Sequence, residues 1–142
     1  MNPEKYVVSL ELAIKLKEKG YPQENSLFGY YDPSDYENRN RELVIVNCIY
    51  AEYLSEYGKA SYEFKYAAPI SDEILEKLPR EISPGFVKYF LICIWEEGVP
   101  NIRYKNFDNQ LLFGWRPEDK TFDKLSDNIA SLWLKLKEGG YL

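Results

Sequence analysis

The chain has 142 residues, which is the length of one ordinary domain. Its hydrophobic fraction of 45% and its aromatic fraction of 16% can fill a core, so a disordered chain is excluded. The sequence contains no histidine, and it therefore lacks the commonest general base, the commonest metal ligand and any Ser-His or Cys-His nucleophile. Its two cysteines are too few for a disulfide framework or a four-cysteine zinc site. We expect neither a metal nor a cofactor.

The net charge of −5 is concentrated in one part of the chain. Residues 22–58 hold seven acidic and two basic residues, whereas the remainder holds 16 of each and is neutral. The same segment contains six of the 13 tyrosines. We predict a single domain over residues 1–142, in which residues 32–59 form a variable, acidic, tyrosine-rich insertion. Nucleic-acid binding is disfavoured, because the sequence offers no basic patch to neutralise phosphates.

Charges near the N-terminus and the setting of the cysteines favour the cytoplasm. Glu11 and Lys15 interrupt the first apolar stretch, so we expect no signal peptide. The uncharged run 89–95 is far too short to cross a bilayer, and we expect no membrane partner. Cys48 and Cys93 stand among large apolar neighbours, which predicts buried, reduced thiols with raised pKa values.

The first element in chain order is an amphipathic helix. Apolar residues at helical spacing after Ser9 predict a helix over residues 10–19, with Ser9 as its N-cap. Gly20 is the expected left-handed stop, and Tyr21 is expected to pack back on Leu16.

The next segments are predicted to be mostly extended. Residues 26–31 form a strand candidate that ends at an Asp-Pro step. Residues 43–57 fit both a strand and a helix, and we favour a strand over 43–50 followed by a helix that stops at Gly58. A half-buried strand over 62–66 follows. Its alternating aromatic residues are predicted to form one face in the core, namely Tyr62, Phe64 and Tyr66.

The chain then turns through a short helix into a strand pair. Residues 71–78 predict a third, shorter helix that Pro79 ends or distorts. The apolar run over 86–95 predicts a central strand, and residues 102–107 return as its antiparallel partner. Residues 111–115 are a candidate for one more strand.

The last helix carries the strongest pattern. Thr121 is its expected N-cap, and an apolar stripe over 122–136 predicts that Trp133 is buried. The strings KLKEKGY (15–21) and KLKEGGY (135–141) differ at one position, which predicts two copies of one capping arrangement. Together, the elements predict an α+β fold, with two long helices and one short helix on one face of an antiparallel sheet of three to five strands.

Several strings resemble a known family when they are taken in order. They are YVVSLELAIKLKEKGY at 6–21, the pair Tyr30-Tyr31, YAAPISDEILEKL at 66–78 and KTFDKLSDNIASLWLKLKEGG at 120–140. Together they resemble a family of small α+β proteins of unknown function from bacteriophages, prophages and gut bacteria. The resemblance implies this fold class and a phage or mobile-element origin, and it implies no chemistry. The chain departs from the family pattern by its extra length between Asp32 and Lys59.

One cluster is the main candidate for an interaction site. It consists of Tyr50, Glu52, Tyr53, Glu56 and Tyr57. Tyrosine is a preferred interface residue, since it buries a large area at low entropy cost and keeps a polar tip. Neighbouring carboxylates suit a basic partner. The alternative is that these tyrosines line the edge of the core on a solvated acidic helix.

Three functions follow from these patterns. The leading hypothesis is a non-enzymatic phage or mobile-element accessory protein that binds a host macromolecule, for example a basic host protein in the bacterial cytoplasm. The alternative is a small-ligand protein that sequesters a nucleotide signal, whose phosphates Arg103, Lys105 and Arg116 would meet. An enzyme of unrecognised class is third. A convergent basic pocket would favour the ligand, and a convex acidic tyrosine patch would favour the partner.

Two acidic stretches are more economically explained as solvated turns than as sites. The loop over 32–40 offers carboxylate oxygens, but Tyr36 and Glu37 stand where a calcium loop of the EF-hand type needs an oxygen ligand and a glycine. Glu96 and Glu97 are adjacent and would point to opposite faces of a strand, which is unsuited to an acid and base pair. No catalytic residue is assigned.

Overall fold

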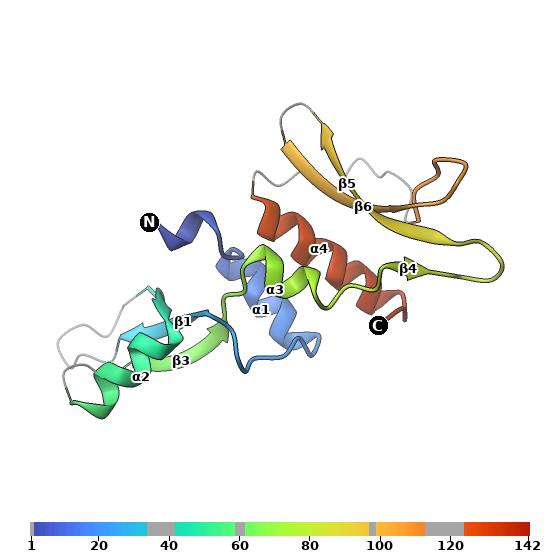
Figure 1. The fold of residues 1–142 in the computed structure, drawn as a ribbon. Helices are drawn as coiled ribbons and strands as arrows, with labels where there is room; N and C mark the ends of the chain where they lie inside the picture. Colours follow the sequence, from blue (N-terminus) through green and yellow to red (C-terminus); the bar gives the residue numbers. More distant parts are fainter. Residues whose placement is uncertain (1, 34–41, 59–61, 97–98, 113–123) are drawn as a thin grey trace.

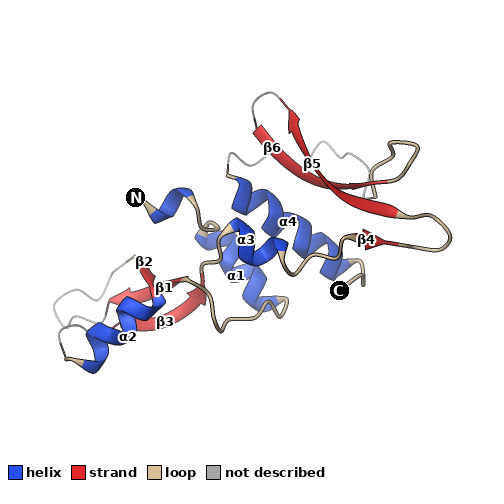
Figure 2. Cartoon of the chain, viewed as in Figure 1, coloured by secondary structure: helices blue, strands red, loops and turns tan. Residues whose placement is uncertain are grey.

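The computed structural model describes residues 2–33, 42–58, 62–96, 99–112 and 124–142. The elements in chain order are η1 (Pro3–Lys5), α1 (Leu10–Glu18), β1 (Phe28–Pro33), β2 (Val44–Asn47), α2 (Cys48–Glu56), β3 (Tyr62–Ala67), α3 (Ser71–Leu75), β4 (Glu81–Ile82), β5 (Tyr89–Glu96), β6 (Val99–Lys105) and α4 (Leu125–Glu138). Figure 2 shows the described helices and strands by type.

The described strands form two three-stranded antiparallel sheets with helices between them. The strand orders are β2-β1-β3 and β4-β5-β6. Helices α1, α3 and α4 lie between the two sheets, and α2 lies beside the first sheet at the far end of the molecule (Figure 1). The α+β class is confirmed. The arrangement differs from the single sheet that we expected, because α3 separates β3 from β4 and packs on α4, so that each sheet covers its own side of the helices.

Helix α4 is the centre of the core. It packs against α1, α3 and β6, and Ile129 and Leu136 are both fully buried. The ring of Trp133 meets the ring of Tyr21 nearly at right angles, with centroids 5.2 Å apart. Trp133 is only 5% exposed, which confirms its predicted burial. The stripe is wider than expected, since three polar residues of the first turns are buried as well, namely Ser126, Asp127 and Asn128.

The two long helices end in the same way, as the repeated string predicts. In α1 the amide of Tyr21 donates to the carbonyl of Leu16 at 2.8 Å, and Gly20 has a φ of +88°. In α4 the corresponding amide and carbonyl are 2.9 Å apart, and Gly140 has a φ of +78°. A left-handed glycine closes both ends, because L side chains rarely adopt this conformation.

The one position at which the two strings differ has a packing reason. In α1 the position is Lys19, and the following Tyr21 ring is buried against Trp133. In α4 the position is Gly139, and a Cβ there would lie 2.8 Å from the ring of Tyr141. The absence of a side chain at Gly139 therefore lets the Tyr141 ring fold back over the end of its own helix.

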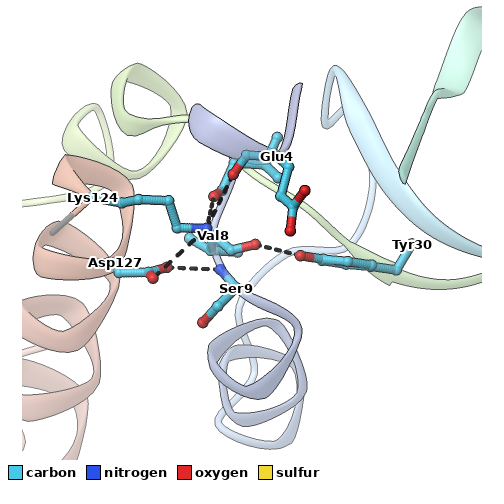
Figure 3. Close-up of polar contacts among 7 residues, drawn as sticks. Glu4, Val8, Ser9, Tyr30, Lys124 and Asp127 are labelled. Carbon is cyan, nitrogen blue, oxygen red and sulfur yellow. Dashed lines mark hydrogen bonds and ion pairs between the residues drawn. The ribbon is translucent and has the colours of Figure 1, made fainter. Parts of the chain in front are cut away.

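The segment that leads into α1 joins several elements through polar contacts (Figure 3). Ser9 occupies the N-cap position, but its side chain makes no capping hydrogen bond, and its amide donates to Asp127 Oδ1 at 2.7 Å. The Tyr30 hydroxyl donates to the carbonyl of Val8 at 2.7 Å. Burial raises the pKa of Tyr30 to about 12, so the hydroxyl keeps its proton as a donor. Lys124 Nζ lies 3.8 Å from Asp127 Oδ2 and donates to two carbonyls of the same segment.

The ambiguous segment 43–57 is a strand followed by a helix, as we favoured. The strand is shorter than expected, since it ends at Asn47, whose side chain accepts a hydrogen bond from the amide of Tyr50 at 3.1 Å. This side-chain cap begins α2 directly after β2. The strand candidate at 111–115 is represented by an isolated bridge at Leu111, and its last residues and the predicted cap Thr121 lie outside the described residues.

The aromatic face of β3 differs from the prediction. A β-bulge shifts the register between β1 and β3, so that Tyr66 lies opposite Tyr30 while Phe64 lies opposite Tyr31. Because directly opposed residues share a face of a sheet, Tyr66 faces the core and Phe64 faces away from it. The prediction of one core face is therefore wrong: Phe64 is 37% exposed, and Tyr62 shares its side of the strand.

We predict that Trp133→Ala destabilises the protein by about 3–5 kcal/mol, because it leaves a large cavity beside Tyr21. Chemical denaturation would measure the change in the free energy of unfolding. A loss below about 1 kcal/mol would show that α4 is peripheral to stability.

We predict that Asp127→Ala destabilises the protein by about 2 kcal/mol, since the partly buried amide of Ser9 then loses its charged acceptor. Asp127→Asn keeps an acceptor oxygen and should lose less. The matched control is Asp72→Ala, which removes an exposed first-turn carboxylate from α3 and should cost under about 1 kcal/mol. Equal losses for Asp127→Ala and Asp72→Ala in thermal unfolding would contradict the role of the buried contact.

Candidate functional site

Helix α2 exposes nearly all of its large apolar side chains. Its one buried residue is Ala51, whereas Ile49, Tyr50 and Tyr57 are 74%, 55% and 61% exposed. Tyr53 and Tyr57 stand one turn apart, and their ring centroids are 4.6 Å apart. An amphipathic helix of a globular protein normally buries such a face, so α2 presents an apolar surface that the described residues do not cover.

The five candidate residues all belong to this helix and its C-terminal cap. Glu52 and Glu56 are exposed and lie beside the tyrosines. We call the exposed side chains of Tyr50, Tyr53, Glu56 and Tyr57 the tyrosine face. No lysine or arginine occurs in the sequence from residue 42 to residue 58. The tyrosine face is therefore aromatic and acidic at once.

A groove runs beside α2, between this helix and the first sheet. Its volume is about 1160 Å³, and it is lined by the loop over 23–27, by the inner side of α2, by β1 and β3, and by one residue of α3. Glu52 lines the groove, whereas Glu56, one turn further along α2, is absent from its lining. The two carboxylates of the predicted cluster thus serve different surfaces.

The floor of the groove is aromatic. The ring centroid of Tyr31 lies 5.4 Å from that of Phe64 and 6.2 Å from that of Tyr62, and both neighbouring rings are nearly perpendicular to it. Gly29 makes room for this cluster, since a Cβ at that position would lie 2.8 Å from the Phe64 ring. A glycine inside a strand is thus required here by the close approach of an aromatic side chain.

Carboxylates line the walls of the groove. Glu73 accepts hydrogen bonds from the amide of Leu27 at 3.0 Å and from the amide of Ile70 at 2.8 Å, so it holds the loop against α3. Glu24 and Glu52 contribute two further carboxylates. None of the described lining residues is a lysine or an arginine. The groove therefore combines an aromatic floor with a negative rim.

Cys48 and Tyr31 form a polar pair in the same groove. Burial raises the pKa of the Cys48 thiol, a hydrogen bond with the Tyr31 hydroxyl lowers it, and the nearby carboxylates of Glu73 and Glu52 raise it. Burial also raises the pKa of Tyr31, with smaller contributions from Cys48 and Glu52. Both groups are therefore protonated and neutral at pH 7, and the formal charge here comes from the carboxylates.

The basic residues proposed for a phosphate ligand lie elsewhere. Arg103 and Lys105 belong to β6 in the second sheet, opposite Ile92 and Phe90, and neither lines the groove. Arg116 lies outside the described residues. The structure does not bring Arg103 or Lys105 to the aromatic groove, and the phosphate ligand stays a prediction.

The acidic turns add no site within the described part of the chain. Most of the loop over 32–40 lies outside the described residues, as does Glu97. Among the residues that the structure describes, no three histidine, cysteine or acidic side chains come together in a way that could hold a metal ion. The described helices are too short or too polar to span a bilayer.

Sequence reasoning found α2 but missed the groove. It assigned Phe64 to the core and gave no role to Tyr31 or Glu73, because their meeting depends on the bulge between two strands. The one local signal was Gly29 in front of the Tyr30-Tyr31 pair, since a glycine within a strand often marks a bulge or a close approach.

The cysteines differ from the prediction of two buried thiols. Cys48 is partly buried in the groove, and Cys93 is exposed on β5. Figure 1 shows that the β5–β6 hairpin extends beyond the described helices. Hydrophobic neighbours in the sequence therefore did not guarantee burial of Cys93.

We predict that a thiol reagent at neutral pH labels Cys93 at least about tenfold faster than Cys48. Cys93 is exposed, whereas the partial burial and the raised pKa of Cys48 both slow the reaction of its thiol. Cys93→Ser should leave only the slow reaction, and Cys48→Ser should leave only the fast one. Equal rates for the two single-cysteine variants, with both variants folded by circular dichroism, would contradict these two environments.

Comparison with known proteins returns no relative for this chain. No family model, no curated protein and no solved structure matches it. The suspected membership of a phage and gut-bacterial family stays a prediction, since none of these comparisons addresses it. The candidate site is therefore judged by its own geometry and charge.

Proposed function

We propose that the protein is a non-enzymatic accessory protein of a phage or mobile element that binds a basic segment of a host protein in the bacterial cytoplasm. The observation that carries the proposal is the exposed tyrosine face of α2 with its neighbouring carboxylates.

The apolar content of the tyrosine face supports a binding role. Water contact is unfavourable for the aromatic rings of Tyr50, Tyr53 and Tyr57, which are 55%, 47% and 61% exposed. A tyrosine loses little side-chain entropy when a partner covers it, and its hydroxyl tolerates water when the partner is absent. Such a surface suits a protein that is free at some times and bound at others.

The charge of this region supports a basic partner. Glu42, Glu52 and Glu56 surround the tyrosines along the chain, and no basic residue interrupts them. A negative surface of this kind speeds encounter with a positive one and disfavours acidic competitors. The sequence has no histidine, which is the commonest general acid and base, and this favours binding over catalysis.

The proposal predicts a salt-sensitive partner that depends on the tyrosine face. The test variant combines Tyr53→Ala with Glu56→Gln, and the matched control combines Tyr6→Ala with Glu18→Gln at exposed positions away from α2. Pull-downs from host lysate at low and high salt, quantified by mass spectrometry, should show a partner that the control keeps and the test variant loses. Binding should weaken above about 0.1 M salt, where charges are screened over about 10 Å.

If the test variant is folded by circular dichroism and retains every salt-sensitive partner of the unmodified protein, the tyrosine face is ordinary surface.

A further inference from the structure

We infer that the groove beside α2 is a binding site for an arginine side chain, whose guanidinium group lies against Phe64 and pairs with Glu52. The inference rests on the proposed function, because it names the chemical group that a basic partner inserts. It adds a second surface to the tyrosine face, on the other side of the same helix.

The size and form of the groove fit an extended peptide segment. Its volume of about 1160 Å³ is above that of a typical small-molecule pocket, so a single side chain would not fill it. Its walls come from α2, from the loop over 23–27 and from the first sheet. A peptide that follows the groove can therefore place one side chain on the aromatic floor while its neighbours contact the walls.

The aromatic floor favours a planar cation. Phe64 is 37% exposed, so the Tyr31 and Tyr62 rings that contact or neighbour it leave part of its surface open. A cation above an aromatic ring is attracted by the negative charge density of the ring face. Guanidinium is flat and weakly hydrated, and it therefore stacks on a ring more readily than an ammonium group does.

The carboxylates of the groove select a positive ligand. Glu52 lies near enough to Tyr31 and Cys48 to raise the pKa of both, which places its charge beside the aromatic floor. Glu73 is held by two backbone amides, so it contributes negative charge from a fixed position. None of the described lining residues carries a positive charge, so none of them would repel a cationic side chain.

The groove is built before any ligand arrives. Gln23 Oε1 accepts from the amide of Ala67 at 2.9 Å, and its Nε2 donates to the carbonyl of Tyr21 at 2.9 Å, which ties the loop to β3 and to the end of α1. The carbonyl of Leu27 accepts from the amide of Cys48 at 3.0 Å, which ties the same loop to α2. Because these walls are already ordered, a ligand does not have to order them on binding.

The test uses the full chain and three matched peptides. In the probe peptide arginine alternates with glycine, and the comparison peptides carry citrulline or lysine in place of arginine. Fluorescence anisotropy at low salt should show that the arginine peptide binds at least about tenfold more tightly than the neutral citrulline peptide. Lysine should bind more weakly than arginine by about threefold, because an ammonium group loses the stacking contact.

Two substitutions on one helix separate the groove from the tyrosine face. Glu52→Gln removes a carboxylate from the groove, and Glu56→Gln removes a carboxylate, which is also exposed, from the tyrosine face. We expect Glu52→Gln to lower the affinity for the arginine peptide by about fivefold. Glu56→Gln should lower this affinity by less than twofold. Phe64→Leu keeps an apolar side chain in the floor and should abolish the preference for arginine over lysine.

The two cysteines report where the peptide binds. Cys48 lines the groove, whereas Cys93 is on the second sheet. A saturating amount of the arginine peptide should slow alkylation of Cys48 by at least about fivefold and leave the rate at Cys93 unchanged.

The outcomes distinguish this inference from the proposed function. Suppose that Glu56→Gln lowers the affinity for the arginine peptide at least as much as Glu52→Gln does, and that the alkylation rate of Cys48 is unchanged. The peptide then lies on the tyrosine face. This result overturns the groove inference, while the proposed function stands. Preference for lysine over arginine, with Cys48 protected, overturns the stacked guanidinium. If no arginine or lysine peptide binds at low salt and the lysate yields no salt-sensitive partner, both proposals fail.

Discussion

Hydrogen bonds around Val8 and Ser9 hold the first sheet to the helices, and water cannot replace those of Val8, because Val8 is fully buried. The amide of Val8 donates to the carbonyl of Pro69 at 3.1 Å, and its carbonyl accepts from the Tyr30 hydroxyl at 2.7 Å. The amide of Ser9 reaches Asp127 at the start of α4. A buried donor that loses its acceptor pays the cost of its lost hydration, so these contacts set the relative positions of α1, β1 and α4.

This constraint also determines the candidate site. Tyr30 and Tyr31 are neighbours on β1, and successive residues of a strand point to opposite faces of the sheet. Because Tyr30 is anchored in the core, Tyr31 must face the other way, towards α2. The bulge opposite them places Phe64 beside Tyr31 and Tyr66 on the core side. One face of the first sheet thus packs on the core, and the opposite face forms the aromatic floor of the groove.

Helix α2 shows how far sequence reasoning reaches and where it stops. The spacing of its tyrosines and the cap at Asn47 are local features, and the strand followed by a helix was correctly favoured. The face of α2 that packs against the first sheet could not be predicted, because the pattern alone does not say whether Tyr53 or Ala51 contacts the sheet. The prediction that Cys93 is buried was wrong for the same reason, since the burial of a strand residue depends on what covers the strand and not on the residues of the strand itself.

The sequence by itself determined the features that depend on neighbouring residues. It determined the α+β class, the ends of the long helices at Gly20 and Gly140, and the apolar stripe of α4, because backbone conformation and helical periodicity are local. The tertiary structure alone decided that the strands divide into two sheets and that Phe64 leaves the core for the groove. Both depend on the pairing of strands that are distant in the chain, and a one-residue shift in that pairing moves a side chain to the opposite face of the sheet.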